Sequence, residues 1–301
     1  MTVLLHSPGR LAQVACLLEA TARKPGNVHR FLDFTDTHYL DFALSALAIG
    51  PALDGASLQG VGRSVLDAVR ATRALVATNT NLGIVLLLAP LAAVPVDRPL
   101  RAGVESVLSA TTIGDARLVY EAVRLALPGG MGKVPDQDLS EEPTGTLREV
   151  MALASGRDLI ARQYVNGFAD VFERALASLD RAVGAGRALE SAIVTAHLNL
   201  LAEVPDTLIA RKCGVAVALD ASRRASEVLA AGWPDSPAGV RLCDEFDRWL
   251  RADGNARNPG ATADLVTAAL FAGLRAGTIG LPLTLSAWGP SAGLPRPGME
   301  T

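Results

Sequence analysis

Apolar residues recur at helical spacing along most of this chain, and the alternating apolar and polar runs that are typical of strands are nearly absent. Hydrophobic residues make up 50% of the sequence, mostly as Ala and Leu, whereas aromatic residues make up 4%. Residues that favour helices therefore outnumber those that favour strands. We predict an all-α protein, a single-domain multi-helix bundle over residues 1–276 followed by a loosely packed Gly- and Pro-rich tail over residues 277–301.

The longest apolar run, from Leu82 to Val96, predicts a helix buried at the centre of the bundle. This run is short for a membrane span and contains Pro90 and Pro95, so we do not expect it to cross a bilayer. Earlier in the chain, Gly50-Pro51 predicts the end of another helix, because glycine often ends a helix and proline cannot continue one.

The sequence Thr146-Leu147-Arg148-Glu149 has the pattern of a capping box and predicts the start of a helix. We expect that helix to pass Ser155-Gly156 and to continue to about residue 183, with Asp158 and Arg162 as an ordinary i,i+4 pair.

The segment from 128 to 145 is rich first in glycine and then in Asp and Glu. It is longer than most connections in compact domains, so we predict either a lid over a site or an excursion. Its glycines do not form a phosphate-binding motif of the G-x-x-x-x-G-K-[ST] type. Further on, His197 lies among Ile, Val and Leu, which is more typical of a hydrogen-bonded core histidine than of a catalyst.

Charge and composition exclude several classes of function. The net charge is −3 and no run of Lys and Arg is present, so we expect no nucleic-acid partner. The N-terminus lacks the pattern of a signal peptide, and we expect a cytoplasmic protein without a membrane partner. Cys16, Cys213 and Cys243 are odd in number and widely spaced, which argues against a disulfide framework or a zinc site.

Four polar turns, at residues 23–33, 78–83, 206–212 and 255–264, interrupt the helical pattern. Each supplies either carboxylates, which suit Mg²⁺, or cationic and N–H groups, which suit phosphates. If the turns converge, they form a magnesium–polyphosphate site. The alternative is that their side chains are solvated charges and helix caps, and capping is the simpler interpretation of Asn79 and Asn81.

Four motifs in these turns resemble, in order, those of the triphosphoribosyl-dephospho-CoA synthase family. They are Glu19 with Lys24-Pro25-Gly26-Asn27-Val28, the turn Asn79-Thr80-Asn81-Leu82-Gly83, Asp206-Thr207 with Arg211, and Asn258-Pro259-Gly260 with Asp264-Leu265. The resemblance implies an all-helical enzyme that transfers the ribose 5-triphosphate unit of ATP to 3′-dephospho-CoA and releases adenine. It also implies Mg²⁺ on the triphosphate.

By this resemblance we expect three groups of site residues. A carboxylate that serves the ribose is either Asp33 or Asp206, and the two cannot be ranked. The expected metal ligands are Glu19 and Asp264. The expected nucleotide-binding residues are Lys24, Asn27, His29, Asn79, Asn81, Arg211, Lys212 and Asn258.

Two departures from the family pattern affect the acceptor. Asn27-Val28-His29 stands where better-known members have Leu-Val-Asp, and Leu82 stands where they carry a basic residue. The Asn-Val-His form resembles proteins associated with tetrahydromethanopterin-linked one-carbon metabolism, so a related phosphoribosyl-type transfer in cofactor biosynthesis is the alternative. A non-enzymatic helical scaffold is a third hypothesis, and the apolar helix surfaces leave a homodimer open.

Overall fold

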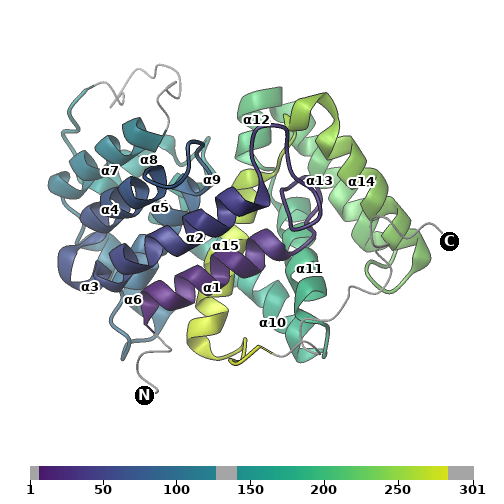
Figure 1. Cartoon of the computed structure of the whole chain (residues 1–301), viewed down its shortest axis with the longest axis horizontal. Helices are drawn as coiled ribbons and strands as arrows, with labels where there is room; N and C mark the ends of the chain where they lie inside the picture. Colours follow the sequence, from purple (N-terminus) through teal and green to yellow (C-terminus); the bar gives the residue numbers. More distant parts are fainter. Residues whose placement is uncertain (1–6, 127–140, 284–301) are drawn as a thin grey trace. The chain divides into compact units, whose positions relative to one another are not determined.

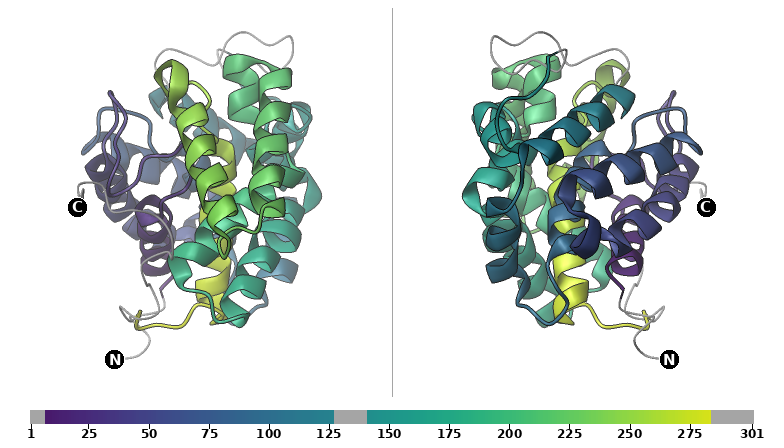
Figure 2. Two further views of the ribbon diagram at one scale, coloured as in Figure 1. Left: turned by 90° about the vertical axis from the view of Figure 1, so that its right-hand side faces the viewer. Right: turned by 90° about the vertical axis from the view of Figure 1, so that its left-hand side faces the viewer.

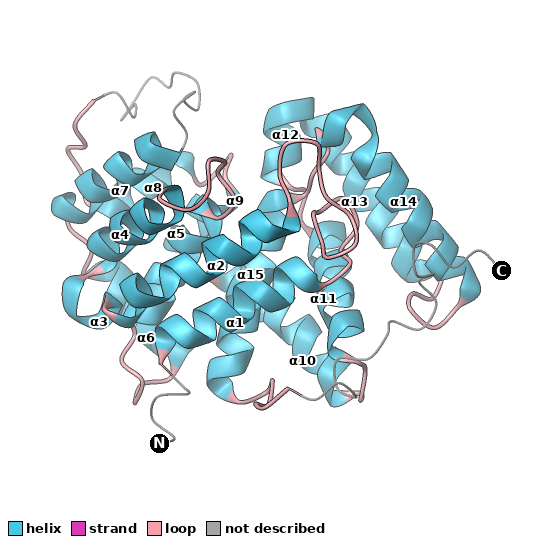
Figure 3. Cartoon of the chain, viewed as in Figure 1, coloured by secondary structure: helices cyan, strands magenta, loops and turns pink. Residues whose placement is uncertain are grey.

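The computed structural model describes residues 7–126 and 141–283. Within these ranges every regular element is a helix, as Figure 3 shows, and the sole β-type pairing is an isolated bridge between His29 and Leu32. The all-α prediction is confirmed. In the same ranges, no helix has both the length and the apolar character needed to span a membrane.

The chain divides into two compact units, one formed by residues 1–17 and 40–169 and the other by residues 18–39 and 170–301. The expected single domain over residues 1–276 stays a prediction. Most of the expected lid at 128–145 and most of the expected tail at 277–301 lie outside the described residues.

The first unit contains helices α1 to α9, although α1 ends in the second unit (Figure 1). Their bounds are α1 Pro8–Thr21, α2 Tyr39–Asp54, α3 Ala56–Gln59, α4 Val61–Arg73, α5 Leu82–Ala93, α6 Leu100–Ser109, α7 Ile113–Ala126, α8 Leu147–Ala154 and α9 Leu159–Asn166. Helix α5 packs against α3, α4, α6 and α9, and every residue of α5 except Gly83 is buried. The predicted buried central helix is therefore confirmed.

Helix α5 continues through Pro90. Because proline has no backbone N–H, the carbonyl of Leu86 has no donor within the helix. The buried phenol of Tyr164 donates to that carbonyl at 2.7 Å. Burial raises the pKa of Tyr164 above its usual range, so the phenol stays protonated and remains a donor.

Helix α2 likewise continues through Gly50-Pro51 to Asp54, so the predicted helix end at Gly50 is wrong. The carbonyl that Pro51 leaves without an intrahelical donor is that of Leu47, and Gln13 Nε2 donates to it at 2.8 Å. Gly50 makes this contact possible, because a Cβ at position 50 would lie 2.4 Å from Gln13 Nε2. Both prolines are tolerated because a side chain from another helix supplies the missing donor.

The capping box of Thr146 and Glu149 is confirmed at the start of α8, but this helix ends at Ala154. The predicted continuous helix to residue 183 is wrong. Asp158 adopts an extended backbone and caps α9 by accepting from the N–H groups of Ile160 and Ala161 at 2.8 and 3.1 Å. Asp158 therefore marks the start of a separate helix, and it does not lie within a helix that continues from α8.

The second unit contains the π-helix η2 and helices α10 to α15. Their bounds are η2 Asp170–Leu176, α10 Ala177–Gly184, α11 Leu189–Glu203, α12 Thr207–Cys213, α13 Val215–Ala230, α14 Pro237–Asn255 and α15 Gly260–Ala276. Helix α13 packs between α11 and α14, and the left view of Figure 2 shows α13 and α14 side by side. Their apolar faces share a core that includes Trp233, Phe246 and Leu250. Helix α15 packs on η2 and α11.

Candidate functional site

Lys24 is the third residue after the end of α1, and its side chain is completely buried. Its Nζ donates to the carbonyls of Glu19 and Ala22, and it pairs with Glu19 Oε1 at 2.9 Å. A cation at this end of the helix satisfies carbonyls that have no intrahelical donor and interacts favourably with the helix dipole. In this structure the three donors of Lys24 therefore all have partners within the chain.

Gly26 forms the sharp turn that follows Lys24, and it has a φ of 74°, in the left-handed region that favours glycine. A Cβ there would lie 2.8 Å from atoms of the Leu250 side chain. The turn is held from two sides. Asp247 of α14 accepts from the Gly26 N–H at 2.7 Å, and Asn258 Nδ2 donates to the Gly26 carbonyl at 2.8 Å.

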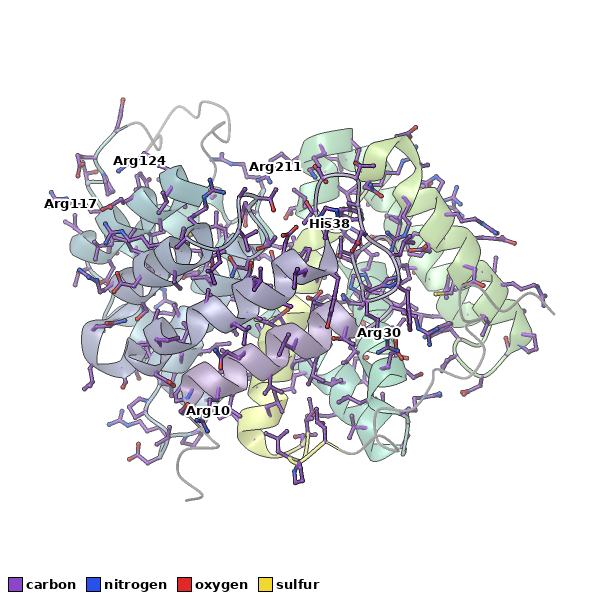
Figure 4. All side chains as sticks on the ribbon, in the orientation of Figure 1. Arg10, Arg30, His38, Arg117, Arg124 and Arg211 are labelled. Carbon is purple, nitrogen blue, oxygen red and sulfur yellow. The ribbon has the colours of Figure 1, made fainter. Side chains whose placement is uncertain are left out.

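A second set of charges lies beside the same turn. Glu190 of α11 is completely buried, and it pairs with Arg23 and Arg30 at 3.0 Å each. The guanidinium of Arg30 lies 4.6 Å from the centroid of the Phe31 ring, and Phe31 is 44% exposed. Figure 4 marks Arg30 on the loop between α1 and α2. This loop therefore carries an aromatic surface beside cations.

Arg251 of α14 completes the charge network. Its Nε lies 2.9 Å from both oxygens of Asp247, and its Nη2 donates to the carbonyl of Asn27. Asn27 itself is buried, and its Nδ2 donates to the carbonyl of Pro25. Each carbonyl from Pro25 to Asn27 thus receives a hydrogen bond, which fixes the backbone of the turn.

His29 is buried beside this network. Burial, and then the positive charges of Arg251, Lys24, Arg23 and Arg30, lower its pKa from 6.5 to about 3. The imidazole is therefore neutral at pH 7. Its Nδ1 accepts from the Phe31 N–H at 3.3 Å, which assigns the proton to Nε2 and makes Nε2 a donor.

Asp206 lies at the N-cap of α12 and is completely buried. One carboxylate oxygen accepts from the N–H groups of Leu208 and Ile209 at 2.8 and 3.1 Å, and the other accepts from the N–H and the hydroxyl of Thr262 at 2.7 and 2.8 Å. Burial raises the pKa of Asp206, and these hydrogen bonds act in the opposite direction. Asp206 therefore joins the start of α12 to the start of α15.

Three of the four polar turns consequently meet in the second unit. Asn258 connects the turn after Lys24 to the turn before α15, and Asp206 connects α12 to α15. Asp33, by contrast, is exposed, and one of its oxygens accepts from the N–H of Tyr39 at 2.7 Å, at the start of α2.

The remaining predicted residues lie on α12 and on α15. Arg211 and Lys212 are exposed in the last turn of α12, where the helix dipole favours cations, so they do not require a nearby anion (Figure 4 labels Arg211). Asp264 is the fifth residue of α15, beyond its first turn, because the helix begins at Gly260. Asp264 is partly buried there.

The turn from Asn79 to Asn81 belongs to the first unit. Asn79 is exposed and its Oδ1 accepts from the Leu82 N–H at 3.1 Å, at the start of α5. Asn81 is buried and donates from Nδ2 to the hydroxyl of Thr72 at 3.1 Å, while the hydroxyls of Thr80 and Ser45 lie 2.6 Å apart. Asn79 therefore makes the capping contact expected of it, whereas the side chain of Asn81, the N-cap residue of α5, makes no capping hydrogen bond.

His197 is a completely buried core residue of α11, as expected, but the expected hydrogen bonds are absent, since neither ring nitrogen has a partner within the described part of the chain. Burial, with a smaller effect of the charge on Lys24, lowers its pKa from 6.5 to about 3. The ring is neutral and packs as an apolar side chain.

Metal-ligating residues do not cluster in the described ranges 7–126 and 141–283, where no group of three or more His, Cys, Asp or Glu side chains could hold an ion. Mg²⁺, however, often binds to one or two carboxylates together with substrate phosphates. A site of that kind needs only part of its ligands from the protein.

Three residues that contact the turn after Lys24 were not predicted from the sequence. Glu190 is a buried charge in an apolar helix, and Asp247 with Arg251 reads as an ordinary surface i,i+4 pair. Glu190 is an acidic residue in the first turn of an otherwise apolar helix, and a buried carboxylate needs a cation nearby. Its position in the sequence could therefore have indicated a cationic partner. No sequence signal separates the Asp247–Arg251 pair from the other helix-surface pairs.

Residues 6–280 match the model of the family described as ATP:dephospho-CoA triphosphoribosyl transferase. The chain belongs to this family. The family is one of enzymes that use a nucleotide substrate, and the resemblance seen in the four motifs is thereby confirmed.

Relatives of known sequence and structure agree with this membership. Proteins named probable 2-(5″-triphosphoribosyl)-3′-dephosphocoenzyme-A synthases from Pseudomonas syringae pv. tomato and Pseudomonas savastanoi pv. phaseolicola are each 32% identical over 41% of this chain. The match spans 45% of the length of either relative. A crystal structure of an Archaeoglobus fulgidus protein, provisionally named triphosphoribosyl-dephospho-CoA synthase, superposes with a TM-score of 0.61 at 26% identity, covering 77% of this chain and 98% of that one.

Proposed function

We propose that this protein transfers the ribose 5-triphosphate unit of ATP to a hydroxyl of the ribose in 3′-dephospho-CoA. The bond between the ATP ribose and adenine breaks, the acceptor oxygen bonds to the same ribose carbon, and the hydroxyl proton leaves with adenine. The observation that supports this most is the family match over residues 6–280. The cationic turn around His29 gives the chain a physical basis for holding a polyphosphate.

The ribose carbon gains positive charge as adenine departs, and a nearby carboxylate would stabilise it. Of the two predicted carboxylates, Asp33 suits this role better than Asp206. Both oxygens of Asp206 are buried and already accept hydrogen bonds from α12 and α15, whereas Asp33 is exposed. We therefore assign the ribose carboxylate to Asp33.

Mg²⁺ is proposed to accompany ATP, and when bound it would neutralise charge on the triphosphate. The hard oxygens of Glu19 and Asp264 suit this ion. Glu19 pairs with Lys24 and Asp264 is partly buried on α15, and both are proposed as protein ligands.

The triphosphate is assigned to the turn after Lys24, with donors from Asn27 and His29 and further contacts from Asn258. The exposed cations Arg211 and Lys212 are proposed to add attraction at longer range. Lys24, Asn79 and Asn81 are further predicted binding residues, and, like Asn27 and Asn258, each has internal partners in this structure. We also propose a cytoplasmic location, and a homodimer is a further prediction.

The reaction is tested by incubating the protein with Mg·ATP, with and without 3′-dephospho-CoA, and by detecting adenine and a triphosphoribosylated product by mass spectrometry. We expect adenine to appear only when the acceptor is present. Thermal stabilisation by Mg·ATP without adenine release would retain the nucleotide site and indicate another acceptor, such as a tetrahydromethanopterin precursor. Absence of both effects would support the scaffold hypothesis.

A further inference from the structure

Arg251 uses two of its three guanidinium nitrogens within the protein. Nε pairs with Asp247 and Nη2 donates to the Asn27 carbonyl. Nη1 is buried and has no hydrogen-bond partner among the residues that the structure describes. A buried guanidinium N–H without an acceptor costs free energy, so a site that retains one is suited to a ligand that supplies the acceptor.

We propose that Arg251 binds a phosphate oxygen of the substrate through Nη1, beside the turn that carries Asn27 and His29. The proposal rests on the function proposed above only in taking triphosphate as the anion. Arg251 belongs to none of the four sequence motifs, and α14 brings it to the turn from a distant part of the chain.

Charged groups surround this position. The turn supplies Arg23, Lys24 and Arg30, and α14 supplies Arg251. The facing carboxylates are Glu19 on α1, Glu190 on α11, and Asp247 and Asp244 on α14, of which Asp244 interacts with Asp247 and Arg23. The four cations are thus matched by carboxylates around a neutral histidine, and the donor left for an anion is Nη1 of Arg251.

A surface loop lies beside the guanidinium of Arg251. The guanidinium carbon lies 5.8 Å from the centroid of the Phe34 ring, and Phe34 is in the loop that joins α1 to α2. In the same loop Phe31 and Leu32 are each 44% exposed. The surroundings of the guanidinium therefore include side chains of a surface loop as well as those of α14.

The test is isothermal titration calorimetry of the full chain with inorganic triphosphate, using Arg251→Met, Asp247→Asn and Arg224→Met. Arg224 is a matched control, because it also pairs with an aspartate four residues earlier, at 2.9 Å, and lies 4.5 Å from an aromatic ring centroid. We expect Arg251→Met to weaken binding by about 10- to 100-fold, the usual worth of a charge-assisted hydrogen bond, and Arg224→Met to leave it unchanged.

Asp247→Asn separates a binding role from a structural one. If Arg251 only holds the turn, both Asp247→Asn and Arg251→Met loosen it and both weaken binding. If Arg251 binds the anion, Arg251→Met weakens binding far more than Asp247→Asn, because an asparagine oxygen can still accept from the Gly26 N–H. Equal weakening by both variants, or wild-type affinity in a folded Arg251→Met protein, overturns the proposal while leaving adenine release intact as evidence for the reaction. Absence of triphosphate binding by the wild type overturns this site and counts against the polyphosphate assignment as well.

Discussion

Two polar turns of this protein carry similar residue types but use them differently. In the turn from Asn79 to Asn81, the side-chain contacts cap α5 or join neighbouring hydroxyls, and no charged residue takes part. In the turn from Lys24 to Arg30, cations and carboxylates from α1, α11 and α14 surround one backbone segment, and Arg251 retains an unused donor. Polar residues at a helix end are thus better evidence for a ligand when charged side chains from several elements gather around them.

The largest expected effect comes from a substitution in the turn after Lys24. We predict that Gly26→Ala destabilises the protein by about 2–5 kcal/mol, because alanine disfavours a φ of 74° and its Cβ would lie 2.8 Å from Leu250. Gly254→Ala is a matched control, since Gly254 has a φ of 65° but open space around it, and should cost only about 1 kcal/mol. Chemical denaturation measures both, and equal costs would show that the turn is not tightly packed.

The next effect concerns the connection between the polar turns of the second unit. We predict that Asp206→Ala costs about 2–4 kcal/mol, because it leaves the buried N–H groups of Ile209 and Thr262 without an acceptor. Asp158→Ala, which removes a partly buried cap with two hydrogen bonds, should cost about 1 kcal/mol. An Asp206→Ala protein as stable as the Asp158→Ala protein would contradict the connecting role.

A third prediction concerns pH. Folding lowers the pKa of both His29 and His197 from 6.5 to about 3, so between these values the unfolded state binds more protons. Stability from each histidine is therefore fully present above pH 6.5 and is lost as the pH falls toward 3, by up to about 1.4 kcal/mol per pH unit. The free energy of unfolding, measured with urea between pH 6.5 and 5, should change less steeply with pH in His197→Leu than in the wild type. An unchanged dependence on pH would contradict a neutral buried ring.

The smallest effects distinguish the two turns directly. Asn79→Ala should lower stability by about 0.5–1 kcal/mol, through loss of a helix cap, and leave triphosphate binding unchanged. Asn27→Ala should weaken triphosphate binding, because Asn27 lies in the charged turn. Calorimetric titration of both variants is the measurement. Weaker binding in Asn79→Ala alone would reverse the comparison.

Sequence periodicity was enough to predict the helical class and the buried helix α5, because both follow from apolar spacing. It failed where a distant side chain changes a local rule. Pro51 lies inside α2 because Gln13 donates to the carbonyl of Leu47, and no local pattern reveals that contact. Three of the four turns that the motifs indicated do meet in the second unit, but Arg251 reaches its turn only through the packing of α14.

The central claim is that the turn after Lys24 receives the triphosphate of the nucleotide. Hydrogen–deuterium exchange of the full chain with and without Mg·ATP tests it most directly. We predict slower exchange in peptides covering residues 22–31 and 247–262 when Mg·ATP is present. Unchanged exchange in both segments, at a nucleotide concentration that stabilises the protein, would contradict the claim and place the nucleotide elsewhere.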